Sequence, residues 1–348
     1  MAEQKPISKS YLDLKSKVWD EGLCSGCGAC IAVCPADSLY FEIGGDSTHP
    51  KSNSYCKAAV DSVPCGACYE VCPRLDEQPS SLLGDYLEIT TGKAEFDVPR
   101  KQSGGAVTAI LANALDTGLV DAVVTVTGDP WTLKPHSMVI TKSEALIGQA
   151  GSRYNWWVPL VSSLKEAVVN RKYRNIAVVG VPCVVQAVRK MLETDHQLVG
   201  PYKKSIRFVL GLFCTESFDY EKLITGKLKS EYALEPMKVC RIDVKGKLEI
   251  TLNDGMQYVI PLTELEDTVR PGCGVCTDFT ALKADISAGS VGSPDGYTTL
   301  VVRTLVGQHV LESAVANKKL RTGGEVDTGI IEKLAKKKLK RKPELKRE

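Results

Sequence analysis

Residues 24–35 decide the fold of the N-terminal part of the chain and have the sequence CSGCGACIAVCP. Four cysteines follow the spacing C-x2-C-x2-C-x3-C and precede a proline, and residues 56–73, CKAAVDSVPCGACYEVCP, repeat the pattern with eight residues in the first gap. A cubane cluster needs four thiolates around a small cage, and two-residue gaps let one tight loop turn three sulfurs inward. The two stretches therefore predict two 4Fe–4S clusters.

The ligands of the two clusters are expected to cross between the two motifs. In two-cluster ferredoxins the cysteine before the proline ligates the other cluster. One predicted set is Cys24, Cys27, Cys30 and Cys72, and the other is Cys56, Cys65, Cys68 and Cys34. A zinc site, the alternative, closes with four ligands and needs no third cysteine step before a Cys-Pro pair. We expect residues 1–80 to form an α+β ferredoxin-like domain.

Length and charge indicate a second domain and a distinct C-terminus. A chain of 348 residues usually forms more than one domain. The formal net charge is +2, yet residues 333–348 carry nine basic and two acidic residues, so the other residues sum to −5. We expect a basic helical tail that docks on an acidic partner subunit or on anionic lipid. A solvated, disordered end is the alternative.

The first residues, MAEQKPISKSYLDLK, lack the apolar region of a signal peptide, and no apolar run reaches the ~20 residues of a membrane span. We therefore expect no transmembrane segment and a cytoplasmic protein. Thiols stay reduced in the cytoplasm, so closely spaced cysteines are expected to bind metal. Nothing in the composition predicts a nucleic-acid partner.

From residue 85 onward the sequence alternates between helix and strand patterns, which favours an α/β domain. We expect helices at 103–117, 157–170, 184–193 and 309–320, and strands at 120–127, 175–181, 205–213 and 298–304. Residues 239–260 predict a hairpin that turns at Asn253-Asp254-Gly255. The sequence contains no G-x-G-x-x-G, so the domain is expected not to be a Rossmann fold.

The second domain contains five more cysteines. Cys273 and Cys276 form a C-x-x-C pair, whereas Cys183 and Cys214 follow predicted strands. Strand ends in an α/β domain converge on one edge of the sheet, so these four thiols predict a third cluster. The alternative is two structural cysteines with a zinc-binding or accidental C-x-x-C. Cys240 is expected to be an ordinary buried thiol.

Two predicted helix starts could bind the phosphates of a cofactor. In Arg100-Lys101-Gln102-Ser103-Gly104-Gly105-Ala106-Val107-Thr108, Ser103 is a candidate N-cap, and Gly104 and Gly105 would expose the first amides. The second start is Gly151-Ser152-Arg153-Tyr154. Two ordinary capped helices are the alternative.

These motifs, in this order, resemble the coenzyme F420 hydrogenase/dehydrogenase β-subunit family. The residues that carry the resemblance are SGGAVT at 103–108, GSRY at 151–154, VPC at 181–183, GLFCTE at 211–216, CGVCTDF at 273–279 and ADIS at 284–287. The resemblance covers residues 85–311 and leaves 312–348 as a C-terminal helix and tail. It implies FAD, hydride exchange with coenzyme F420, and a cluster on Cys183, Cys214, Cys273 and Cys276. It implies cofactor contacts from Arg100, Ser103, Gly104, Gly105, Thr108, Ser152, Arg153, Tyr154 and Glu216, and no catalytic acid or base.

A ferredoxin-fused member resembles the electron-input subunit of the membrane-bound reduced-F420 dehydrogenase of methanogenic archaea. That resemblance implies oxidation of reduced F420 and electron delivery to a membrane-bound complex or a ferredoxin, at the inner face of the cell membrane. The alternatives are the β-subunit of an F420-dependent formate dehydrogenase, part of a sulfite reductase, or a flavin-free electron-transfer adaptor.

Overall fold

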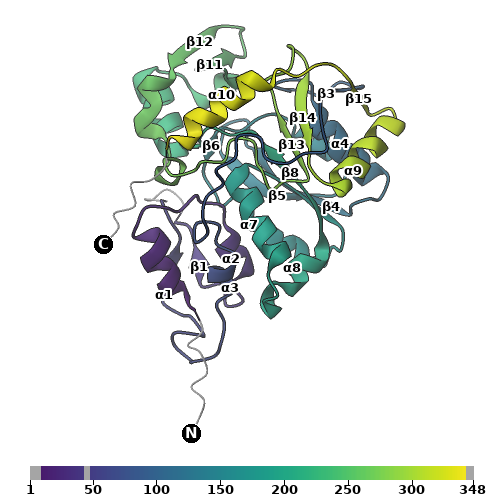
Figure 1. Ribbon diagram of the computed structural model, residues 1–348. Helices are drawn as coiled ribbons and strands as arrows, with labels where there is room; N and C mark the ends of the chain where they lie inside the picture. The colour runs from purple at the N-terminus through teal and green to yellow at the C-terminus, as the bar shows by residue number, and fades with distance from the viewer. Residues whose placement is uncertain (1–8, 43–47, 342–348) are drawn as a thin grey trace.

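The computed structural model describes residues 9–42 and 48–341. The N-terminal module, purple and dark blue in Figure 1, consists of short helices around the first eight cysteines. Its elements are α1 (Tyr11–Leu14), the π-helical turn η1 (Lys15–Trp19), α2 (Ala29–Val33), α3 (Ala67–Glu70), and the antiparallel pair β1 (Leu39–Tyr40) and β2 (Lys51–Ser52). This arrangement agrees with the expected ferredoxin-like region.

The second domain is built on a mixed sheet with the strand order β15-β3-β14-β13-β8-β7-β4-β5. The central strands β13, β8, β7 and β4 are parallel, whereas β5 on one side and β14, β3 and β15 on the other each pair antiparallel with their neighbours. The bounds are β3 (Glu88–Ala94), β4 (Ala122–Gly128), β5 (Pro135–Ile140), β7 (Ile176–Gly180), β8 (Ile206–Leu212), β13 (Ile286–Gly289), β14 (Thr298–Val302) and β15 (Leu320–Thr322).

Helices cover both faces of this sheet. Neighbouring residues on β4 point to opposite sides, so Val123 packs beneath α4 (Ala106–Asp116) and α9 (Leu305–Ala316), whereas Val124 packs beneath α7 (Pro182–Glu193) and α8 (Gly200–Ser205). Burial on both faces explains the nearly continuous apolar strands. The helix predicted at 103–117 begins only at Ala106, and that predicted at 157–170 is helical only in α6 (Ser163–Lys165) and η2 (Glu166–Asn170). The short helix α5 (Ser143–Gly148) was not predicted.

The ferredoxin module shares a core with the second domain. Ala29, Ala32 and Val33 of α2 belong to the same buried cluster as Val184 of α7 and Val209 of β8. Packing of this kind fixes the module against the sheet, because separating the two would expose that apolar surface to water. The segment 74–84 therefore joins two parts that already touch.

A smaller sheet of β10 (Val239–Val244), β11 (Lys247–Leu252) and β12 (Gln257–Pro261) packs on the π-helical segment η4 (Glu221–Glu231). The predicted hairpin is present as β11–β12, and a second turn at Gly246, with φ +75°, adds β10. A short parallel pair, β6 (Asn155–Trp156) and β9 (Phe218–Asp219), lies beside it.

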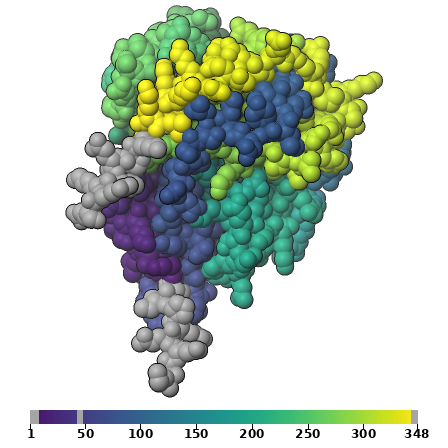
Figure 2. Space-filling model, viewed as in Figure 1, coloured from purple at the N-terminus to yellow at the C-terminus, as the bar shows by residue number. Residues whose placement is uncertain are grey.

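The C-terminal helix α10 (Thr328–Leu339), yellow in Figure 1, crosses the molecule between the smaller sheet and the main sheet. In the surface view of Figure 2 it lies directly against other parts of the chain. Ile331 and Ala335 are completely buried in a core with Leu83 and Phe279. Among the described residues, no helix has both the length and the apolar character that a bilayer span requires.

Candidate functional site

Cys24, Cys27, Cys30 and Cys72 form the first thiol group. Burial raises the pKa of Cys30 well above its ordinary value, and the thiols of Cys27, Cys24, Cys72 and Cys68 add to the rise. Gly28 lies between Cys27 and Cys30 and is the N-cap of α2 with φ +85°. Glycine lets this loop lie against the second domain, because a Cβ there would overlap Pro159. Cys72 lies close enough to affect the pKa of Cys30, and its assignment as a ligand of this group stays a prediction.

Cys56, Cys65, Cys68 and Cys34 form the second group. Burial raises the pKa of Cys68 to about 12, and the thiols of Cys34, Cys65 and Cys56 act in the same direction. Gly66, with φ +98°, is the N-cap of α3 and turns the chain between Cys65 and Cys68. A Cβ there would lie 3.1 Å from the carbonyl oxygen of Lys9. Positions of this kind suit glycine because a left-handed backbone strains other residues.

Cys183, Cys214, Cys273 and Cys276 form the third group, where the carboxyl ends of the adjacent parallel strands β7 and β8 meet. Cys183 lies in the first turn of α7, and Cys214 follows β8. Burial raises the pKa of Cys214 to about 12, opposed by Lys338 and reinforced by the thiols of Cys273 and Cys276. The structure thus brings the four predicted thiols to one edge of the sheet.

The three thiol groups fit cubane clusters by the chemistry of their donors. Each has four thiols, of which one is buried and three are partly buried, and four thiolates are the ligand set that a 4Fe–4S cluster requires. Among residues 9–42 and 48–341, no three Cys, His, Asp or Glu side chains have the close spacing of a single-ion site.

The C-terminal tail takes part in the third group, which the sequence did not predict. Lys338 is buried, and its Nζ donates a hydrogen bond of 2.5 Å to the carbonyl oxygen of Cys214. Arg341 donates to the carbonyl oxygen of Thr215 at 3.0 Å and forms an ion pair of 2.5 Å with Glu216. The expectation of a basic tail that faces outward is therefore wrong for Lys338 and Arg341. Residues 342–348 lie outside the described part of the chain.

Buried cations also affect the thiol of Cys276. Burial alone would raise its pKa, but Lys338 and Arg74 hold the pKa of Cys276 below its ordinary value. Glu216, which was predicted to contact the cofactor, is instead engaged with Arg341 beside the third group. A carboxylate held in this way serves the packing of α10.

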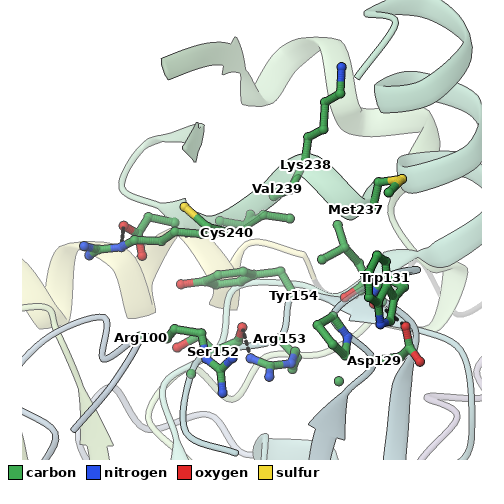
Figure 3. A pocket seen from close by; sticks show the side chains of 18 of the residues that line it. Arg100, Asp129, Trp131, Ser152, Arg153, Tyr154, Met237, Lys238, Val239 and Cys240 are labelled. Carbon is green, nitrogen blue, oxygen red and sulfur yellow. Dashed lines mark hydrogen bonds and ion pairs between the residues drawn. The ribbon is translucent and has the colours of Figure 1, made fainter. Parts of the chain in front are cut away.

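A cavity of about 570 Å³ lies between the main sheet and the smaller sheet (Figure 3). Its lining comes from Arg100 and Gln102, residues 128–131, Leu133, residues 151–155 and 237–243, and Asn253. This volume is within the range of small-molecule and cofactor sites. Four of the predicted cofactor residues line it: Arg100, Ser152, Arg153 and Tyr154.

Two arginines lie together on one side of the cavity in Figure 3. Burial, together with the charge of Arg100, lowers the pKa of Arg153 below its ordinary value. Arg100 donates hydrogen bonds to the carbonyl oxygens of Ala150 and Gly148. Within the described parts of the chain, neither arginine forms an ion pair with a carboxylate. Two adjacent, uncompensated cations fit the phosphates of a dinucleotide.

The Tyr154 side chain crosses the cavity between these arginines and the strand that carries Val239 and Cys240 (Figure 3). Its Oη is buried and has no hydrogen-bond partner among the residues that the structure describes. Burial raises the pKa of Tyr154, so its hydroxyl is a neutral donor near pH 7. A buried polar atom without a partner is rare, and a bound cofactor would supply one.

Residues 103–108 of the first predicted helix start are not part of this cavity, whereas Arg100 and Gln102 before them line it. Ser103 is not the N-cap of α4: Gly105 is, with φ +73°, and the Ser103 hydroxyl lies 2.8 Å from that of Thr298. The amide of Gly104 donates to the same threonine at 3.0 Å, so it is not available to a phosphate. Thr108 lies within α4. The expectation that Gly104 exposes its amide is therefore wrong, because strand β14 fills that place.

Several residues of the cavity were not predicted from the sequence. Cys240 was expected to be buried, yet it is exposed in the cavity lining. Val239 takes the buried position, and the register of β10 shifts between Val239 and Arg241, which turns Cys240 outward. The alternation of Lys238, Val239 and Cys240 was a signal for this arrangement. Trp131, 67% exposed, lines the same cavity.

Short contacts connect the cavity to the third thiol group. The backbone carbonyl of Tyr154 accepts hydrogen bonds from the amide of Phe218 at 2.9 Å and the hydroxyl of Ser217 at 3.3 Å. The amide of Ser217 in turn donates to the Sγ of Cys273 at 3.4 Å. Trp156, the second residue of β6, donates a hydrogen bond of 3.0 Å from its Nε1 to the carbonyl oxygen of Gly26, beside the first group.

Comparison with known proteins identifies three matching regions. Residues 89–165 match the N-terminal part, and residues 173–328 the C-terminal part, of the coenzyme F420 hydrogenase/dehydrogenase β-subunit family. Residues 17–40 match a 4Fe-4S binding domain.

Similar proteins come from methanogens. An uncharacterized protein of Methanocaldococcus jannaschii is 41% identical over 96% of this chain and 98% of its own length. A subunit of the F420H2 dehydrogenase of Methanosarcina mazei is 30% identical over 84% of this chain and 82% of its length. A chain of the F420-reducing [NiFe] hydrogenase complex from Methanosarcina barkeri has a TM-score of 0.67 and 32% identity, over 76% of this chain and 92% of that chain. The protein therefore belongs to the coenzyme F420 hydrogenase/dehydrogenase β-subunit family, with a 4Fe–4S module at its N-terminus.

Proposed function

We propose that this chain oxidises reduced coenzyme F420 and delivers the electrons to a partner, with FAD bound in the cavity and a 4Fe–4S cluster at each thiol group. The observation that carries the proposal is the continuous line of contacts from Tyr154 through Ser217 to Cys273. FAD exchanges electrons in pairs or singly, so it suits a place between a hydride donor and one-electron clusters.

The residues of the chain bind and orient in this proposal. Arg100 and Arg153 would hold the phosphates of FAD through charge-assisted hydrogen bonds. The Tyr154 hydroxyl would donate to a polar atom of the cofactor, and Ser152 lies at the rim beside it. The four thiols of each group would hold its cluster. Hydride transfer between the two cofactors needs no acid or base from the protein.

The acceptor is proposed to be a membrane-bound electron-transfer complex or a ferredoxin, with the protein at the inner face of the membrane. Four exposed lysines support docking on a negatively charged surface: Lys333, Lys336, Lys337 and Lys340 of the C-terminal segment. These four side chains keep the electrostatic role that was expected of the whole tail. Lys338, by contrast, is buried and does not take part in docking.

The test is anaerobic preparation followed by mixing with reduced F420. We expect about twelve irons and one FAD per chain, from three clusters of four irons each. Reduced F420 should bleach the flavin and then the clusters, and NADH should not. About eight irons would reject the third cluster, whereas one equivalent of zinc would favour the alternative for Cys273 and Cys276.

The same preparation separates the alternatives. Absence of flavin after iron removal would favour the flavin-free adaptor. Co-purification with a molybdenum subunit would favour the formate dehydrogenase β-subunit, co-purification with a siroheme protein would favour sulfite reduction, and co-purification with a membrane complex would favour the electron-input subunit.

A further inference from the structure

Arg74 is a buried cation located between the first and third thiol groups. It follows Cys72 and Pro73, and it is only 9% exposed. Its guanidinium donates hydrogen bonds to the carbonyl oxygen of Gly272 at 3.0 Å and to Gln78 Oε1 at 2.6 Å. Its Nε is buried and without a hydrogen-bond partner in the described part of the chain.

The charge of Arg74 interacts with thiols of both groups. Burial opposes the charge, yet Cys276 and Cys183 of the third group raise the pKa of Arg74 above its ordinary value. In the first group, burial raises the pKa of Cys27, and Arg74 counteracts the rise. No carboxylate forms an ion pair with Arg74 among residues 9–42 and 48–341. Buried charges are normally paired, so with clusters bound the thiolates of the two groups would be its counter-charges.

Backbone contacts bring the same two groups together. A Cβ at Gly272, next to Cys273, would overlap the carbonyl oxygen of Cys24. The second group has a different neighbour: His196 lies 3.1 Å from the carbonyl oxygen of Cys65. Burial and the thiols of Cys34, Cys65 and Cys56 raise the pKa of Cys68, with no contribution from Arg74 among the main causes.

We propose that Arg74 is a positioning residue shared by the first and third cysteine sites, and that its fixed charge couples these two sites and leaves the second apart. The proposal rests on the proposed function, in which all three sites hold clusters. Arginine stays protonated in proteins, so its charge does not vary with pH. A cation in a low-dielectric interior stabilises the more negative, reduced state of both neighbouring sites and so raises both reduction potentials.

The test compares Arg74→Gln with Arg74→Lys and with Lys190→Gln in the complete, iron-loaded protein. Lys190 forms an ion pair of 2.7 Å with Asp76, and its side chain has no hydrogen bond to a cysteine among the described residues. Cluster potentials are measured by redox titration with EPR detection. The signals are assigned with Cys30→Ser, Cys68→Ser and Cys214→Ser, one variant for each site.

Arg74→Gln should make reduction of the first and third sites about tenfold less favourable, which is 59 mV for one electron. The second site should keep its potential, Arg74→Lys should restore most of the shift, and Lys190→Gln should change none. If Arg74→Gln fails to assemble fully, iron should be missing from the first and third sites only. A shift in one site, an equal shift in all three, or iron loss from all three would overturn the proposal.

Failure of this proposal is distinguishable from failure of the proposed function, because the titration uses no F420. If the first and third sites shift in potential as expected but the protein does not react with reduced F420, only the proposed substrate is rejected.

Discussion

Glycine at position 272 determines how closely the ferredoxin module approaches the third thiol group. Its backbone conformation is accessible to any residue, so a substitution there tests packing without adding left-handed strain. Gly274, two residues later in the same loop, is a matched control, because the nearest atom to a Cβ there is 3.2 Å away.

We predict that Gly272→Ala lowers the free energy of unfolding by about 1–3 kcal/mol, the usual cost of an overpacked site. The physical reason is overlap of the new methyl group with the Cys24 carbonyl. Iron content should fall at the first and third sites, and Gly274→Ala should resemble the parent protein in both measurements. Thermal denaturation and iron assays check this prediction. Equal effects of the two substitutions would contradict it.

Substitution of Arg153 tests whether the cavity binds the flavin. Loss of one charged hydrogen-bonding group costs about 1.5–3 kcal/mol, so Arg153→Ala should weaken FAD binding by about ten- to a hundredfold. Arg171→Ala is the control, because Arg171 is exposed and forms an ion pair with Glu166. Flavin binding is measured by fluorescence, with iron content as a check on folding. Full flavin retention in Arg153→Ala would place the cofactor elsewhere.

Gly105→Asp, a change at the first predicted helix start, does not isolate flavin binding. Gly105 has φ +73°, and a Cβ there would lie 3.1 Å from the Val98 side chain. Any substitution would strain the start of α4. Loss of flavin in this variant would therefore report the folding of the helix as much as cofactor contact.

At the scale of elements, α10 combines two roles on its two faces. Its inner face buries Ile331, Ala335 and Lys338, whereas Lys336 and Lys337 are exposed. Residues 333–348 follow the region that matches the family, so their deletion is one test of the tail. The deletion would also remove the contacts of Lys338 and Arg341 with the Cys214–Glu216 segment, so it does not test the exposed lysines alone.

We predict that Lys338→Met causes loss of iron from the third site, since it removes a buried cation and leaves the Cys214 carbonyl without its donor. Replacement of Lys336, Lys337 and Lys340 by glutamine should leave iron content unchanged and weaken electron delivery to the membrane fraction, and raised salt should mimic it. Iron assays and membrane-linked turnover measure the two effects. Iron loss in the triple variant, or full iron content in Lys338→Met, would contradict this division of roles.

At the scale of the whole molecule, buried thiols make the metal-free fold sensitive to alkaline pH. Burial raises the pKa of Cys24 to about 11 and those of Cys68 and Cys214 to about 12. In the unfolded chain the same thiols lose their protons near pH 8.5. Above that pH the unfolded state binds fewer protons than the folded state, so the free energy of unfolding falls as pH rises.

We predict that the metal-free protein keeps this part of its stability below about pH 8.5 and loses it progressively toward about pH 11. Urea denaturation at a series of pH values measures the effect. A metal-free variant with Cys24, Cys68 and Cys214 replaced by serine should show a weaker dependence between pH 8 and 10. The same slope in both proteins would assign the pH dependence to other groups.

The sequence by itself was sufficient for the N-terminal 4Fe–4S region and the class of the fold. Fixed spacing before Cys34-Pro35 and Cys72-Pro73 determines which sulfurs one loop can present, and apolar runs such as 122–127 identify buried strands. Motif order was sufficient for the family. These features are local, so a linear pattern records them.

Only the tertiary structure decided which distant residues meet. Lys338, Arg74 and Cys240 lie in ordinary-looking segments, and their burial or exposure depends on elements far away in the sequence. The Gly104 amide, which the sequence assigned to a phosphate, donates a hydrogen bond to Thr298 of β14 instead. Hydrogen bonding and burial depend on the packing of whole elements, and a local pattern does not specify which strand or helix will fill a given place.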